Sequence, residues 1–151
     1  MKPSNEEQAR LLKLLDEEQG IFEQILGLTR KQTELLAMDD IEAFDQSLDG
    51  RQELMEKING LHQETNALMQ SYISFAQSPG GEKSGDVEAA HSRLRGVITE
   101  CAQLNEANMD AAKAMAEDYV KRSEKLNLGR KSIGAYALGV PNNSELFDKK
   151  T

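Results

Sequence analysis

The sequence of 151 residues contains no tryptophan, only 5% aromatic residues and a single cysteine, Cys101. One cysteine cannot form a disulfide within the chain, and the small aromatic content argues against a thick, multilayered core. No stretch approaches the roughly 18 consecutive apolar residues that cross a bilayer, and residues 1–7 lack the apolar segment of a secretion signal. We therefore expect a cytoplasmic protein without membrane insertion, in which Cys101 is a small buried apolar residue.

The charge and the absent motifs exclude further classes of function. The formal net charge is −8 at pH 7, whereas nucleic acids and anionic lipid surfaces bind basic faces. The sequence contains no glycine-rich phosphate loop, no cysteine or histidine pair at metal spacing and no nucleophile elbow. Its many carboxylates are scattered, as is typical of solvated helix faces. We expect no catalysis, no cofactor, no metal site and no nucleic-acid partner.

Apolar residues recur every three or four positions over three long stretches, which predicts helices at about 5–37, 39–76 and 86–126. In the first stretch the apolar residues come in adjacent pairs, so its stripe is wide enough to face two neighbours. The pattern predicts an all-α protein: an elongated, antiparallel, coiled-coil-like bundle of three long helices over residues 1–126. Within this bundle we expect the second helix to be the internal spine.

Polar residues indicate where the helices begin and how they align. Asp39 is the expected N-cap of the second helix, and Glu42 follows three residues later as in a capping box. Asp86 is the expected N-cap of the third helix. Asn108 falls on the apolar stripe of that helix, where a polar residue can fix the register between helices.

Residues 127–151 differ in character from the preceding chain. Gly129, Gly134, Gly139 and Pro141 predict that no long helix continues here, and the segment carries four basic and two acidic residues. Apolar side chains nevertheless persist, which indicates that this segment packs on the bundle, on a second subunit or on a partner. We expect a partly ordered C-terminal tail or a short helix.

The run from His91 to Gly96 approaches the pattern of histidine phosphotransfer domains, which are also acidic helical bundles. Those domains carry an exposed histidine followed closely by Lys-Gly. Here the spacing is one residue longer, and one residue turns the face of a helix by about 100°. A phosphotransfer bundle that uses His91 and a structural or oligomerising coiled-coil protein are the alternatives that the sequence leaves open.

Four segments resemble the FlgN-like flagellar type III export chaperones. They are the helical junction at 35–44, the Leu-Asn-Glu-Ala-Asn run at 104–108, the tyrosine between glycines at 134–139 and the ending at 144–150. The resemblance implies a chaperone that binds hook-associated (hook–filament junction) proteins through their C-terminal helical regions. It would prevent their premature assembly and deliver them to the flagellar export gate. Formation of a homodimer is a further option.

The resemblance also implies which residues act. The end of the third helix and residues 127–151 would form a cargo- and gate-binding tail, in which Tyr136 takes part in docking to the export gate. Asn105 would be a structural residue, together with Asn108, Asp39 and Glu42. The expected protein-binding residues are Met115, Tyr119, Leu126, Leu128, Ile133, Tyr136, Leu138, Val140, Leu146 and Phe147. Deleting residues 127–151 is expected to weaken cargo binding while helicity and melting stay nearly intact.

Overall fold

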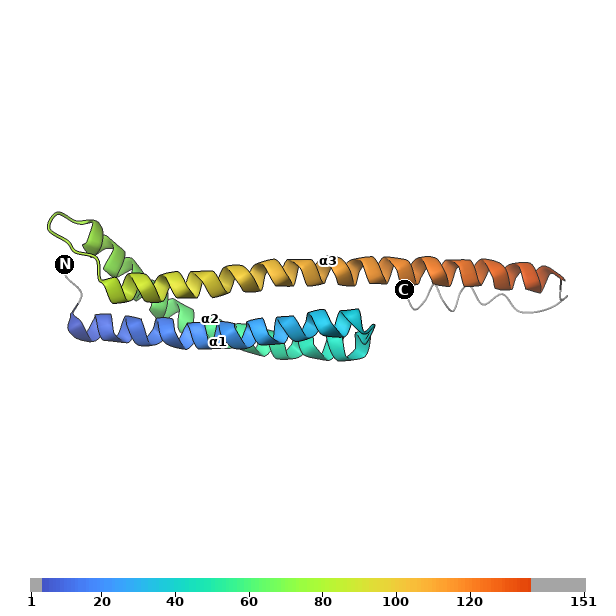
Figure 1. The fold of residues 1–151 in the computed structure, drawn as a ribbon, viewed down its shortest axis with the longest axis horizontal. Helices are drawn as coiled ribbons and strands as arrows, with labels where there is room; N and C mark the ends of the chain where they lie inside the picture. Colours follow the sequence, from blue (N-terminus) through green and yellow to red (C-terminus); the bar gives the residue numbers. More distant parts are fainter. Residues whose placement is uncertain (1–3, 137–151) are drawn as a thin grey trace. The chain divides into compact units, whose positions relative to one another are not determined.

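Three helices make up the described part of this computed structural model, which covers residues 4–136 and, for the side chains, residues 4–127. They are α1 (Asn5–Ala37), α2 (Ile41–Gln77) and α3 (Gly85–Tyr136), and residues 4–136 contain no strand (Figure 1). The predicted all-α bundle is confirmed. The chain divides into two compact units, Met1–Asn108 and Met109–Thr151. The first unit contains α1, α2 and residues 85–108 of α3.

The turn between α1 and α2 is closed by hydrogen bonds at the end of α1. The backbone N–H groups of Asp39 and Asp40 donate to the carbonyls of Leu36 at 3.1 Å and Leu35 at 2.9 Å, which is the Schellman arrangement. Asp39 consequently has a φ of 59° and lies in the left-handed region, so it is not the N-cap that the sequence suggested. The N-cap is Asp40, whose Oδ1 accepts a backbone hydrogen bond at 3.2 Å, and Glu42 lies in the first turn of α2.

The connection from α2 to α3 is a turn that requires glycine. Gly80 has a φ of +77°, and a Cβ added to Gly81 would lie 1.9 Å from the carbonyl oxygen of Phe75. Ser84 then caps α3, because its Oγ accepts a hydrogen bond from a backbone N–H of the first turn at 3.3 Å. The predicted cap was therefore wrong: Asp86 lies inside the first turn, where an acidic side chain favours the helix dipole.

The carboxyl end of α3 also lies beyond the predicted boundary at residue 126. The helix runs to Tyr136 and passes through Gly129 and Gly134, which the sequence suggested would interrupt it. A glycine lowers helix stability by about 1 kcal/mol, but unlike proline it removes no backbone hydrogen bond. Two separated glycines are thus too weak a signal to end a long helix. Gly139 and Pro141 lie outside the described residues.

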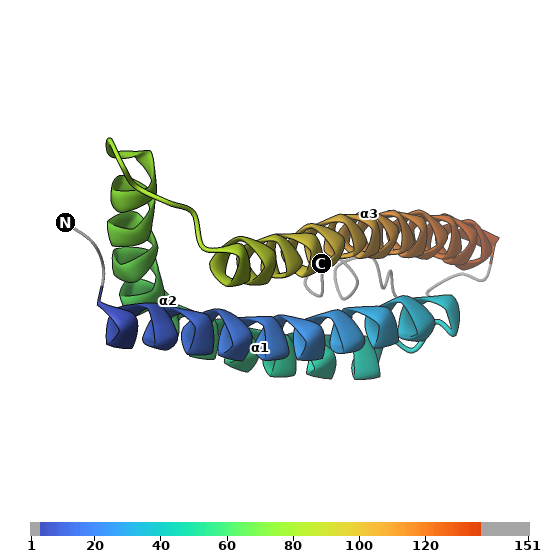
Figure 2. The same ribbon diagram turned by 60° about the vertical axis from the view of Figure 1, so that its left-hand side comes forward.

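α1 is the internal helix of the first unit, which corrects the prediction that the second helix is the spine. Ten residues of α1 are buried, against four of α2. α1 and α2 run antiparallel, and the later part of α2 lies with the beginning of α3 on one side of α1 (Figures 1 and 2). The wide stripe of α1 can contact both neighbours, whereas the stripe of α2 leaves Ile41 and Leu48 exposed.

Two apolar clusters form the core of the first unit, and each draws residues from all three helices. Cys101 belongs to the second cluster and is 3% exposed, with its Sγ 3.3 Å from the carbonyl oxygen of Phe22. Burial raises the pKa of this thiol. The expectation of a small buried apolar residue is confirmed. The buried members are Leu11, Leu15, Tyr72, Val87, Ala90 and Leu94 in one cluster and Ile25, Leu26, Ile58 and Cys101 in the other.

Candidate functional site

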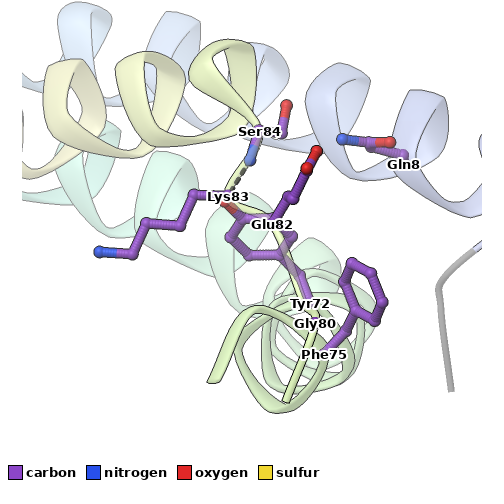
Figure 3. A pocket seen from close by; sticks show the side chains of 7 residues that line it. All are labelled: Gln8, Tyr72, Phe75, Gly80, Glu82, Lys83 and Ser84. Atoms are coloured by element: carbon purple, nitrogen blue, oxygen red, sulfur yellow. Dashed lines mark hydrogen bonds between the residues drawn. The ribbon is translucent and has the colours of Figure 1, made fainter. Parts of the chain in front are cut away.

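A cavity of about 640 Å³ lies at the connection between α2 and α3 (Figure 3). Tyr72 anchors it: the hydroxyl accepts a hydrogen bond from the N–H of Ser84 at 2.9 Å and donates one to Oε1 of Glu88 at 3.0 Å. Burial is the main cause that raises the pKa of Tyr72. Figure 3 shows Lys83 extending away from the ring. Because both hydrogen bonds of the hydroxyl tie parts of the fold together, this cavity organises the connection and is not our candidate site.

Asn108 joins α3 to α1 through its side-chain amide. Nδ2 donates to the carbonyl of Thr29 at 2.9 Å, and Oδ1 accepts a hydrogen bond from the hydroxyl of Thr33 at 2.7 Å. Asn105 is half-buried, and its Oδ1 finds no hydrogen-bond partner among the described residues. Only one of these two asparagines is thus seen to connect helices, and the role of either in setting the register stays a prediction.

The apolar stripe of α3 continues into the second unit, where two of its large side chains are exposed. Met115 is half-buried, whereas Tyr119 and Leu126 are 69% and 59% exposed. Met109 and Val120 add exposed apolar surface nearby in the sequence. Large apolar side chains at helical spacing suit the apolar face of a partner helix. We call Met115, Tyr119 and Leu126 the exposed stripe, and it is the candidate protein-binding surface.

The remaining predicted protein-binding residues cannot be placed in this surface. Leu128, Ile133 and Tyr136 belong to α3, but their side chains lie outside the described ones. The others, which lie outside the described residues altogether, are Leu138, Val140, Leu146 and Phe147.

Sequence reasoning did not single out a buried acid in the first unit. Glu18 of α1 is 2% exposed, and its Oε1 lies 3.3 Å from Nδ1 of His62 in α2. The available signal was its position, because Glu18 stands where the paired apolar stripe of α1 lacks a pair. A carboxylate at such a position is either pointed away from the core or held there by a partner. The three-dimensional structure distinguishes these two cases.

The described part of the chain contains neither a metal-binding cluster nor a helix that could span a membrane. Within residues 4–136, no group of three histidine, cysteine, aspartate or glutamate side chains could hold a metal ion. The helices described there are also not apolar enough over a sufficient length to span a bilayer.

The described fold is an all-α bundle with an apolar stripe exposed on one helix. A family model described as FlgN protein matches residues 1–129, and the chain therefore belongs to the FlgN family. This confirms the family that the sequence resembled, and it identifies the protein in general terms as a flagellar export chaperone. Among curated proteins and among solved structures, none matches the chain.

Proposed function

We propose that this protein is a cytoplasmic chaperone for hook-associated proteins of the flagellum. It binds their C-terminal helical regions, keeps them from assembling before export and delivers them to the export gate. Membership of the FlgN family supports the general role. The observation that carries the specific role is the exposed stripe, because Tyr119 and Leu126 present large apolar side chains to solvent.

The chemistry of the stripe fits a helical cargo segment. A helix that assembles with others carries an apolar seam, and an apolar face of similar spacing can cover that seam. Burying a side chain of the size of Leu126 is worth roughly 1.5–3 kcal/mol, so a few such anchors give useful affinity. Like-charged acidic surfaces repel, so the net charge of −8 favours a cargo segment that is not itself strongly acidic.

The stripe can be tested with the full chain and C-terminal helical fragments of hook-associated proteins. The double variant Tyr119→Ser/Leu126→Ser should weaken binding about tenfold or more in calorimetry, because interface anchors dominate affinity. Met38→Ser is the matched control, since Met38 is 64% exposed but lies in the turn between α1 and α2. If the double variant and the control bind cargo with equal affinity, the exposed stripe is not part of the cargo-binding site.

Residues 127–151 complete the proposed cargo- and gate-binding region. Their deletion should lower cargo affinity and leave the melting of the first unit unchanged. It should also lower the helical signal, since α3 continues to Tyr136. Tyr136→Ala in the full chain separates the two tasks: cargo binding should persist while secretion of the cargo falls. A loss of cargo binding in that variant would instead assign Tyr136 to the cargo.

A homodimer is the second candidate for what covers the stripe, because a second copy offers the same apolar side chains. The chaperone proposal expects the free protein to keep Tyr119 and Leu126 accessible until cargo binds. Light scattering during size exclusion, with and without cargo, distinguishes the two. A dimer that is broken by Tyr119→Ser/Leu126→Ser, with cargo affinity unchanged, would favour self-association.

A further inference from the structure

A groove in the first unit lies outside the region that the proposed function uses. It encloses about 410 Å³ and is bounded by the later part of α2 and the beginning of α3, with α1 contributing Leu15, Glu18 and Phe22. Both bounding segments lie on the same side of α1 (Figures 1 and 2). Its apolar rim includes Ile73 of α2 and Ile98 of α3, which are 41% and 37% exposed. Two large isoleucine side chains are therefore left partly in water beside an apolar groove.

Glu18 gives this groove a specific chemical character. Its side chain is 3% exposed, and His62, whose side chain is 64% exposed, supplies its hydrogen-bond partner at Oε1. Oε2 is buried and finds no partner among the described residues. A buried polar oxygen without a partner costs free energy, and a donor arriving from outside would recover it. Four described side chains carry such an atom, and of these four residues Glu18 is the one that contributes to the lining of the groove.

The dimensions favour one face of a helix as the occupant. On α2 the lining extends from Ile58 to Ile73, which corresponds to about 22 Å of helix at 1.5 Å per residue. A helix of that length and roughly 10 Å in diameter is far larger than the cavity, so only the side chains of one face can enter. Anchors spaced by three and four residues would fill the groove in the way that amphipathic helices bind.

The charges around the groove select the polar group of this occupant. The carboxylate of Glu18 accepts hydrogen bonds, and its best donor is a lysine or arginine, because charge-assisted hydrogen bonds are the strongest that a carboxylate makes. Arg95 and His91 of α3 and His62 of α2 also line the groove. The guanidinium of Arg95 would repel a second cation at the rim. The matching segment therefore carries one central basic residue among apolar ones.

We propose that this groove between α2 and α3 binds an amphipathic helix of the exported cargo, with one lysine or arginine that reaches Oε2 of Glu18. The partner's identity rests on the proposed function, whereas the recognition chemistry rests on the groove. Cargo then contacts the protein at two places, the exposed stripe and the groove. The Glu18 contact selects which helix enters, because a segment without the central cation leaves the buried Oε2 without a partner.

The test uses the full chain, cargo C-terminal helical fragments and fluorescence anisotropy. Glu18→Gln keeps the shape of the side chain and should weaken binding at least tenfold. Glu17→Gln removes the same charge from an exposed neighbour and should not. Ile73→Ser and Ile98→Ser should each weaken binding severalfold, whereas Ile41→Ser, at a 44% exposed isoleucine outside the groove, should not. Circular dichroism melts verify that each variant is folded.

The cargo side completes the experiment. Each lysine and arginine of the fragment is replaced by methionine, one at a time. One of these replacements should weaken binding of the fragment to the unsubstituted protein at least tenfold. The same replacement should not weaken binding further when the protein carries Glu18→Gln. Such a result identifies the cargo residue that pairs with Glu18. If the fragment binds but neither Glu18→Gln nor the isoleucine variants differ from their controls, the groove inference is wrong and the chaperone proposal stands. A fragment that does not bind at all overturns both. A change of oligomeric state with unchanged cargo binding assigns the groove to a second copy and also overturns it.

Discussion

Replacing Asn108 by alanine removes the amide that connects α3 to α1. The hydrogen bond from Nδ2 to the carbonyl of Thr29 is lost, at about 1 kcal/mol. The hydroxyl of Thr33 loses its contact to Oδ1, but it still reaches the carbonyl of Thr29 at 3.3 Å, so this second loss is partial. The cavity left by the shorter side chain lowers stability further, whereas the higher helix propensity of alanine raises it by about 0.5 kcal/mol. We expect a net loss of about 1–2 kcal/mol in the free energy of unfolding.

The assay is urea unfolding followed by circular dichroism at 222 nm, with the slope compared between variants. Asn105→Ala is the matched control on the same helix, because Oδ1 of Asn105 has no partner among the described residues. It should not lower the free energy of unfolding, because it removes a buried oxygen without a partner and introduces a residue of higher helix propensity. In a double-mutant cycle, Asn108→Ala and Thr33→Ala should show a coupling of roughly 1 kcal/mol. Equal effects of the two asparagine variants would refute this reasoning.

Three further predictions concern the turns and the thiol. Asp39→Gly should raise stability by about 1 kcal/mol in the same assay, because glycine adopts a φ of 59° without strain, and a loss would contradict the assignment. Gly81→Ala should lower the melting temperature, because its Cβ would lie 1.9 Å from the Phe75 oxygen. Gly60→Ala, in a helix and with nothing within 4 Å, should raise it. Burial raises the pKa of Cys101, so its contribution to stability is present below the unfolded pKa and is lost as pH rises through the folded one. A thiol reagent at pH 8 should react with native Cys101 far more slowly than with the urea-unfolded chain, and equal rates would contradict burial.

The parts of the fold that local sequence determines were predictable. The bounds predicted for the first helix, residues 5–37, agree with α1 (Asn5–Ala37) because apolar spacing and the flanking turn both act within a few residues. The N-caps of α2 and α3 were each misplaced. Asp39 and Asp86 are good capping residues. Asp39 instead belongs to the Schellman turn at the end of α1, and Ser84 caps α3 in place of Asp86. Capping preference alone does not choose between neighbouring candidates.

The choice of the internal helix could not be made from stripe length. The stripe of α2 is long, yet Ile41 and Leu48 are exposed, because burial depends on what the other helices cover. The paired stripe of α1 was the better signal, since its width permits contact with both neighbours. The groove with Glu18 depends on residues from three helices, and no local pattern brings Glu18, Ile73 and Ile98 together.

We propose that buried polar groups help a bundle with such repetitive stripes to select one alignment. Nε2 of Gln32 in α1 donates to Oγ of Ser47 in α2 at 3.0 Å, and Thr33 of α1 donates to Asn108 of α3 at 2.7 Å. If α3 slipped by one heptad, the apolar spacing would still match, but Cys101 could replace Asn108 as the residue opposite Thr33. Asn108 would then lose its hydrogen bonds to Thr29 and Thr33, at a cost of about 0.5–1.5 kcal/mol each. The apolar stripes favour several alignments, and we expect the polar pairs along α1 to discriminate between them.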